Sequence, residues 1–244
     1  MATGEHAAEQ RNFTEALSFF IQRRRKALIV FFAVLIVCLL GLVIALQVRK
    51  NRIEVSSARI EAVQQQYTDW LAAKDEAEKE NAAVDIVAKA GVLEEDLAAA
   101  AQAIIKEFPD LYAQMRAQDI LASIAFRKKE YEKAAELWMV LAEKHPKTYY
   151  APFALQNACA AWEEAGRPDK AAEALTQVVT KFSAAFPDMP RVLFSLGRLA
   201  EAGETFEDAQ THYNRLVEEY PGSSWTKLAY NRIIFLEAQN KIQK

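Results

Sequence analysis

Cysteine, histidine, glycine and proline are all scarce in this chain. Its 244 residues include two cysteines, three histidines, seven glycines and seven prolines. Cys38 falls within a long apolar run, which leaves Cys159 alone in the remainder, so no disulfide within one domain is expected and the fold must rest on its core. His6, His145 and His212 show no Cys/His spacing that suggests a zinc site.

Catalytic motifs are also missing. There is no glycine-rich phosphate-binding loop and no nucleophile elbow. Carboxylates are frequent, but clusters such as Glu94-Glu95-Asp96 are typical of solvated helix faces or of charges at helix N-termini. We therefore expect a protein that is not an enzyme and that needs no metal and no other cofactor.

After residue 50, acidic residues outnumber basic ones. Residues 1–50 hold seven Lys or Arg and three Asp or Glu, which gives +4, and the whole chain carries −3, so the remainder carries −7. Nucleic-acid binding needs a basic face. An acidic remainder therefore predicts no nucleic-acid partner.

No charge interrupts the run from Ala27 to Leu46. Fifteen of these twenty residues are Leu, Ile, Val or Phe. A helix of this length is about 30 Å long, which matches the hydrocarbon core of a bilayer, and its insertion is favoured by several kcal/mol. A core helix this long would carry a polar stripe. The run predicts a single transmembrane helix over 27–48.

Three other interpretations of this run are weaker. A cleaved signal peptide has a shorter apolar region and a small-residue cleavage site, which is missing here. Lipidation of Cys38 is disfavoured because Leu35-Ile36-Val37 puts no small residue beside it. The basic cluster at 23–26 faintly resembles a twin-arginine signal, but charge that sets membrane orientation is the simpler interpretation.

The flanking charges predict which side of the membrane each part occupies. Basic residues slightly favour the N-terminal flank, and such residues stay in the cytoplasm. We therefore expect a bacterial inner-membrane protein with residues 1–26 in the cytoplasm and the remainder in the periplasm.

Neither glycine nor proline occurs between Gly41 and Gly91, so the membrane helix can continue well beyond the bilayer. Apolar residues fall at helical spacing along it: Ile60, Val63, Tyr67, Trp70 and Leu71. This pattern predicts either a coiled-coil stalk or the first helix of a packed domain, and its short extent favours the latter. Residues 49–92 are accordingly predicted as a juxtamembrane helix or linker with the first domain helix.

Four later stretches resemble one another: 94–109, 131–146, 168–183 and 206–221. Their starts are 37, 37 and 38 residues apart. Each begins with an acidic turn and continues with a small residue, then a large one four positions later. This periodicity indicates a repeat array.

The pattern resembles the second helix of the tetratricopeptide repeat (TPR). The matching small, large and terminating residues are Ala134, Ala171, Ala209, Trp138, Leu175, Tyr213, Pro146 and Pro221, whereas Ser183 departs from the terminator. In the first helices, Leu196-Gly197 matches the family's Leu-Gly pair, and Leu121-Ala122 and Ala158-Cys159 match it loosely. The first unit is divergent, with Leu97 at the small position and Ala101 at the large one.

This resemblance implies an all-α chain: an N-terminal single transmembrane helix followed by a TPR-like helical-hairpin repeat (α-solenoid) domain over 93–244. Stacked hairpins bury faces that one hairpin cannot bury alone. Residues 223–240, with apolar residues near helical spacing, are predicted to form a C-terminal capping helix.

In the TPR family the first helices line a groove that binds segments of partner proteins. The corresponding residues here are Arg116, Asp119, Phe126, Phe153, Gln156, Arg191, Phe194 and Arg198. The simpler alternatives are core packing for the phenylalanines and solvation for the arginines. The family's carboxylate clamp needs Lys and Asn where this chain has Asp119 and Ser123, which disfavours binding of cytosolic chaperone tails in that manner.

The whole-chain plan resembles the YfgM-like group of bacterial inner-membrane proteins, which are ancillary to the Sec translocon and work with periplasmic chaperones. This resemblance implies a membrane-tethered scaffold for protein–protein interaction, with those proteins as partners. Tyr220-Pro221-Gly222-Ser223 also resembles repeat junctions of envelope-assembly proteins. A structural scaffold for cell-envelope assembly or cell division is therefore the second hypothesis, and an enzyme is the third.

Overall fold

The computed structural model describes residues 22–182 and 186–243. Residues 1–21 of the predicted cytoplasmic segment 1–26 therefore lie outside the described residues. Ser183 also lies outside them. The chain divides into two compact units, Met1–Val55 and Ser56–Lys244.

The first unit contains the first part of helix α2 (Arg25–Ala77). Every Leu, Ile, Val and Phe side chain from Ile29 to Val48 is between 41% and 68% exposed. Among the described residues, α2 is the one helix long and apolar enough to cross a membrane. The predicted span from Ala27 to Leu46 lies entirely within it.

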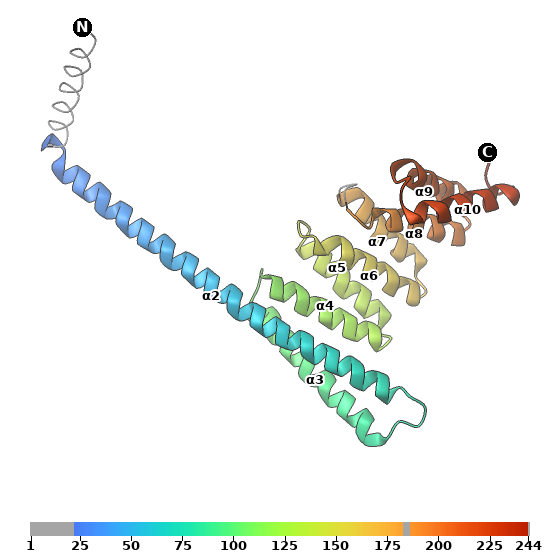
Figure 1. The fold of residues 1–244 in the computed structure, drawn as a ribbon, viewed down its shortest axis with the longest axis horizontal. Coiled ribbons are helices and arrows are strands. Elements are labelled where there is room, and N and C mark those ends of the chain that lie inside the picture. The colour runs from blue at the N-terminus through green and yellow to red at the C-terminus, as the bar shows by residue number, and fades with distance from the viewer. Residues whose placement is uncertain (1–21, 183–185, 244) are drawn as a thin grey trace, which may run out of the picture. The chain divides into compact units, whose positions relative to one another are not determined.

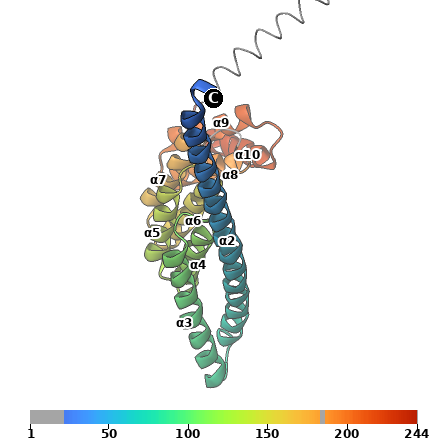
Figure 2. The same ribbon diagram turned by 90° about the vertical axis from the view of Figure 1, so that its left-hand side faces the viewer.

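The second unit contains the rest of α2 and a stack of helical hairpins (Figures 1 and 2). Its other helices are α3 (Val84–Glu107), α4 (Tyr112–Arg127), α5 (Tyr131–Lys144), α6 (Tyr150–Glu164), α7 (Pro168–Lys181), α8 (Met189–Ala202), α9 (Phe206–Glu219) and α10 (Ser224–Ala238). No strand occurs among the described residues. The predicted all-α class is confirmed, with α4–α5, α6–α7 and α8–α9 as TPR-like hairpins.

The hairpin turns repeat the same backbone geometry. Three residues in these turns have positive φ: Lys129 at 63°, Gly166 at 69° and Glu204 at 59°. They are 37 and 38 residues apart. The amide that follows each of them donates to a carbonyl five residues earlier: Glu130 to Ala125 at 2.9 Å, Arg167 to Trp162 at 2.8 Å and Thr205 to Ala200 at 2.9 Å. This left-handed cap ends the first helix of each pair and starts the second.

The small and large repeat positions account for the tight hairpins. Ala134, Ala171 and Ala209 are each 0% exposed, because a small side chain lets two helices approach. The large residues four positions later are Trp138, Leu175 and Tyr213, at 5%, 2% and 0% exposed. They fill the space between helices and form part of one continuous core.

The second part of α2 belongs to the packed domain. Its Ile60, Val63 and Trp70 are buried in a cluster with residues of α3 and α4. Leu97 and Ala101 of α3, the residues at the small and large positions of the divergent unit, are each 0% exposed in the same cluster. Of the two hypotheses for this segment, the domain helix is therefore the one observed.

Gly91 does not interrupt a helix. It lies inside α3, so the boundary predicted between residues 92 and 93 falls within a helix, and the turn before α3 contains Asn81 with φ of 67°. A glycine inside a helix costs only about 1 kcal/mol. The burial of α3 by α2 and α4 outweighs that cost.

The predicted C-terminal helix is present as α10. Its N-cap is Ser223, whose hydroxyl accepts a hydrogen bond from the amide of Trp225 at 3.3 Å. Ala229 and Leu236 are both 0% exposed and join the main core. Helix α10 thereby covers α8 and α9.

Candidate partner-binding surface

The eight predicted groove residues lie on the first helices of three successive hairpins. Arg116, Asp119 and Phe126 belong to α4, Phe153 and Gln156 to α6, and Arg191, Phe194 and Arg198 to α8. Their surroundings differ strongly from α4 to α8.

In α4 the charged groove residues are engaged within the fold. Asp119 accepts hydrogen bonds from the indole of Trp138 at 2.9 Å and from the hydroxyl of Tyr150 at 2.8 Å, and it pairs with Arg116 at 3.2 Å. Arg116 also donates to the Tyr150 hydroxyl. The side chains of Arg116 and Asp119 are only 20% and 14% exposed. This network joins α4, α5 and α6, which indicates a structural role.

The Tyr150 hydroxyl stays protonated in this network. Burial raises the pKa of Tyr150, and the negative charge of Asp119 raises it further. The phenol can therefore donate to Asp119 at any physiological pH.

Two other predicted residues are also largely internal. Phe126 packs against the rings of Tyr131 and Trp138, with centroids 5.2 Å and 5.9 Å away. Gln156 is half-buried, and its amide nitrogen is buried with no hydrogen-bond partner among the described residues. Phe126 thus fits the core interpretation, whereas Gln156 keeps an unused donor.

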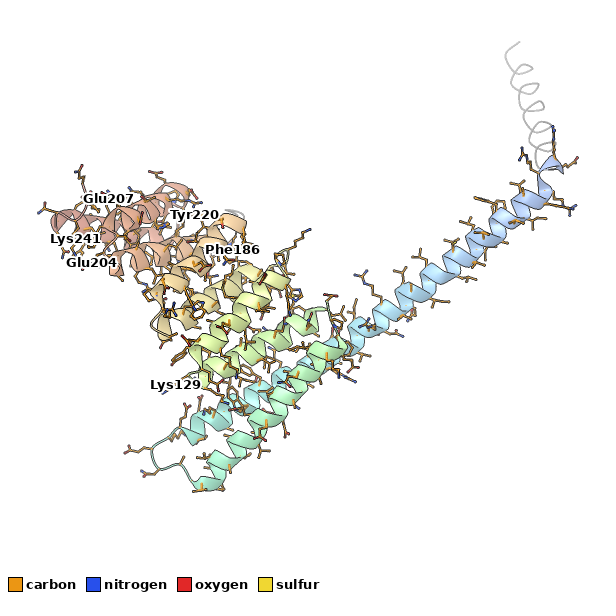
Figure 3. The ribbon with its side chains drawn as sticks, turned by 180° about the vertical axis from the view of Figure 1, so that it is seen from behind. Lys129, Phe186, Glu204, Glu207, Tyr220 and Lys241 are labelled. Carbon is orange, nitrogen blue, oxygen red and sulfur yellow. The ribbon has the colours of Figure 1, made fainter. Side chains whose placement is uncertain are left out.

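Aromatic side chains gather where α4, α6 and α8 begin. Phe153 is 41% exposed and packs edge-on against Phe186, the labelled residue just before α8 in Figure 3, at 5.2 Å. Tyr149, at 63% exposed, hydrogen-bonds Tyr112, which is 49% exposed. Sequence reasoning missed the two tyrosines, although Tyr112 is the first residue of α4 and Tyr149 immediately precedes α6. Phe153, Tyr112 and Tyr149 are thus exposed aromatic residues at or near the starts of α4 and α6.

The α8 residues are the most open of the predicted set. The side chain of Arg191 is 57% exposed and lies 3.6 Å from Asp188. Arg198 is 47% exposed and pairs with Glu163 of α6 at 2.5 Å. Phe194 is half-buried between Tyr213 and Trp225, with centroids at 5.7 Å and 5.3 Å.

A pocket of about 360 Å³ lies beside Phe194. It is lined by Phe194, Arg198, Glu201, Ala202, Tyr213 and Arg232. Glu201 accepts from the Tyr213 hydroxyl at 3.1 Å and from Arg232 at 3.0 Å. Burial raises the pKa of Tyr213 to about 12, so its hydroxyl remains a donor. Sequence reasoning missed Glu201 and Arg232, which lie 31 residues apart.

Nucleophilic chemistry has no support at this surface. Cys159 is 4% exposed, and burial together with the nearby Glu163 raises the pKa of its thiol to about 12. A thiol held protonated is a poor nucleophile. The described part of the chain groups no three His, Cys, Asp or Glu side chains in a way that could hold a metal ion.

Comparison with known proteins supports the repeat assignment. A tetratricopeptide repeat family model matches residues 155–224, which include all of α7, α8 and α9. A TPR repeat-containing protein of Treponema pallidum (strain Nichols) is 34% identical over 125 residues, which are 51% of this chain. The aligned part spans about half of that relative's length, 52%. Residues 155–224 are therefore similar to tetratricopeptide repeats, and part of the chain is similar to a protein named for such repeats.

Proposed function

We propose that this protein is a non-enzymatic, membrane-tethered scaffold that binds other proteins through the first helices of its TPR hairpins. The observation that carries the proposal is the exposure of Phe153 on α6 and of Arg191 and Arg198 on α8, with the half-buried Phe194 beside Arg198. Aromatic and arginine side chains are enriched at protein interfaces, where they supply contact area and directed hydrogen bonds. A stack of TPR hairpins is the kind of fold that presents such a surface to a polypeptide.

The tether is proposed from the first unit. Fifteen exposed Leu, Ile, Val and Phe side chains between Ile29 and Val48 form an apolar surface all round the helix. Such a surface suits lipid and not water. The basic residues before it support a cytoplasmic N-terminus and a periplasmic repeat domain at the bacterial inner membrane.

The partners proposed are the Sec translocon and periplasmic chaperones. Their support is the resemblance in whole-chain plan, together with a tether that would hold the repeat surface near the membrane. Extended segments of emerging proteins would meet an aromatic surface flanked by arginines. TPR domains generally act as scaffolds, which agrees with a function without catalysis.

Affinity capture tests the partner proposal. The full chain, tagged after Lys244, is crosslinked in cells, purified and analysed by mass spectrometry beside the double variant Phe153→Ala/Arg191→Glu. Translocon subunits or periplasmic chaperones should be recovered with the wild type and lost with this variant. A matched control, Val140→Ala/Lys133→Glu on α5, should keep them.

A topology reporter tests the location separately. A fusion partner that is active only outside the cytoplasm, placed after Lys244, should be active. Activity of a cytoplasmic reporter at the same place would contradict the orientation and the periplasmic partners together. A septal focus of the tagged chain would favour the scaffold for envelope assembly or cell division.

A further inference from the structure

The outer face of α10 is apolar at its centre and charged at both ends. Lys227, Tyr230, Ile234 and Glu237 are three, four and three residues apart, which places them on one face of the helix. Tyr230 is 51% exposed and Ile234 is 60% exposed. Terminal helices of repeat arrays normally present a polar outer face to water, so this face differs from a simple cap.

The same face is buried in the internal repeats. Counted from the proline that ends the preceding hairpin, Tyr230 corresponds to Leu155 of α6 and Ile234 corresponds to Cys159. Those residues are only 2% and 4% exposed. The position on α10 is therefore one that a neighbouring helix covers elsewhere in the stack.

In the two hairpins α6–α7 and α8–α9, the second helix covers the first. Lys170 of α7 lies over the ring of Trp162 of α6, 4.1 Å from its centroid. Tyr213 of α9 lies so close to Gly197 of α8 that a Cβ there would be 2.4 Å from its ring. Among the described residues no second helix follows α10.

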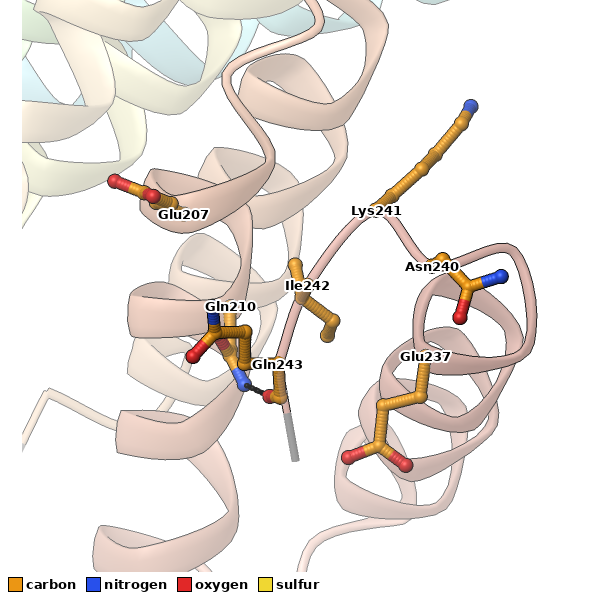
Figure 4. Close-up of a pocket in the computed structure, with 7 residues that line it drawn as sticks. All are labelled: Glu207, Gln210, Glu237, Asn240, Lys241, Ile242 and Gln243. Carbon is orange, nitrogen blue, oxygen red and sulfur yellow. Dashed lines mark hydrogen bonds between the residues drawn. The ribbon is translucent and has the colours of Figure 1, made fainter.

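The segment after α10 leaves most of this face open. The side-chain amide of Gln210 on α9 donates to the carbonyl of Gln243 at 3.0 Å, which holds that segment along α9 (Figure 4). Glu237 borders the pocket between this segment and α10. Tyr230 and Ile234 do not line that pocket.

The face is complementary to itself. When two copies of α10 pack antiparallel about a two-fold axis level with residue 232, Tyr230 lies opposite the partner's Ile234, and Lys227 lies opposite the partner's Glu237. Each pair occurs twice, as a symmetric contact requires. Neither Lys227 nor Glu237 makes an ion pair among the described residues, so both remain available for the partner subunit.

We propose that this face of α10 binds a second copy of the same chain, as a two-fold symmetric dimer. The apolar centre supplies the burial and the two outer ion pairs set the antiparallel register. A helix of unrelated sequence would have to reproduce both the spacing and the sign of these charges. One helix from each copy makes a contact smaller than a standard stable interface, so the dimer depends on protein concentration.

A charge exchange tests the register. The full chain in detergent is compared by sedimentation over a range of concentrations. Lys227→Glu or Glu237→Lys alone places like charges opposite each other twice, and each should raise the dimer dissociation constant about tenfold or more. The double variant Lys227→Glu/Glu237→Lys restores both pairs and should return the constant to near the wild-type value.

The matched control is Leu228→Glu, an equally drastic change at a 46% exposed residue of α10 that lies outside this face. It should leave the dimer unchanged. A wild-type chain that stays monomeric at every concentration would overturn the proposal, and so would a double variant no better than the single ones. Either result would assign the face to another polypeptide or to solvent.

Disulfide trapping adds a test that does not depend on affinity. In a chain carrying Cys38→Ala and Cys159→Ala, the pair Lys227→Cys/Glu237→Cys should give a covalent dimer on oxidation. Glu237→Cys alone should give little, because the two cysteines would then be about 15 Å apart along the helix pair. Equal trapping of both variants, or none of either, would overturn the antiparallel register.

Discussion

The ring of Tyr213 occupies the space where a side chain at Gly197 would lie. A Cβ at residue 197 would be 2.4 Å from Cε1 of Tyr213 and 2.6 Å from its Cδ1. Tyr213 is 0% exposed and cannot swing into solvent without opening the core. The glycine of α8 and the large residue of α9 therefore fit together as one unit of packing.

Replacing Gly197 by alanine should destabilise the repeat domain by about 1–3 kcal/mol, because an added methyl overpacks a filled core. The measurement is denaturant unfolding of the full chain in detergent, followed by circular dichroism. Gly91→Ala is the matched control, since Gly91 is also inside a helix but has nothing within 4 Å of the added Cβ. It should stabilise by about 0.5–1 kcal/mol through helix propensity alone. Equal effects of the two variants would contradict this account of α8 and α9.

The repeat period predicted much of this fold because its signals are local. Helices α5, α7 and α9 begin at residues 131, 168 and 206, where the aligned stretches begin. The boundary predicted between residues 92 and 93 is wrong because an exposed glycine inside a long packed helix, such as Gly91 in α3, cannot be told from a helix end by sequence alone. Tertiary packing decides between the two, and sequence spacing does not show it.

The groove was harder to predict than the fold. Asp119 stands at a groove position, yet its hydrogen-bond partners Trp138 and Tyr150 lie 19 and 31 residues away. Glu163 and Arg198 are 35 residues apart. A period of 37 or 38 residues predicts which positions share a face, but not which side chains on that face are already engaged.

The hairpin turns offer a second prediction, on backbone conformation. Lys129 and Gly166 occupy equivalent left-handed positions, with φ of 63° and 69°. Lys129→Gly should stabilise the chain by up to about 1 kcal/mol, because glycine adopts this conformation without steric cost. Gly166→Ala should destabilise by about 1 kcal/mol for the converse reason. Thermal unfolding would show shifts of opposite sign, and shifts of the same sign would contradict the equivalence of the two turns.

Substitutions in α4 should lower the stability of the fold, whereas substitutions of exposed residues in α8 should lower partner binding. Asp119→Ala leaves the Trp138 indole and the Tyr150 hydroxyl without their acceptor and removes the ion-pair partner of Arg116, so we expect a loss of about 2–4 kcal/mol. Arg191→Glu changes an exposed side chain and should alter stability by less than about 0.5 kcal/mol. Partner recovery should nevertheless fall with Arg191→Glu. A large unfolding penalty for Arg191→Glu would mean that this arginine serves the fold.

The half-buried His212 makes stability depend on pH. Burial lowers the pKa of His212, and Arg215 lowers it further while Asp208 opposes this. The unfolded chain takes up a proton near pH 6.5 that the folded chain does not, so stability should fall as the pH drops from about 7.5 to about 5.5. His212→Gln should flatten that slope. An unchanged slope would show that His212 is accessible to protons in the folded state.

Site-specific photocrosslinking in cells tests the central claim most directly. A photoreactive residue at Phe153 or Arg191, on the proposed surface, is compared with one at Val140 of α5, which is 41% exposed, the same fraction as Phe153. The account predicts defined protein adducts from Phe153 and Arg191 and none from Val140. Adducts that are absent, or equally abundant from all three positions, would contradict a binding surface on the first helices.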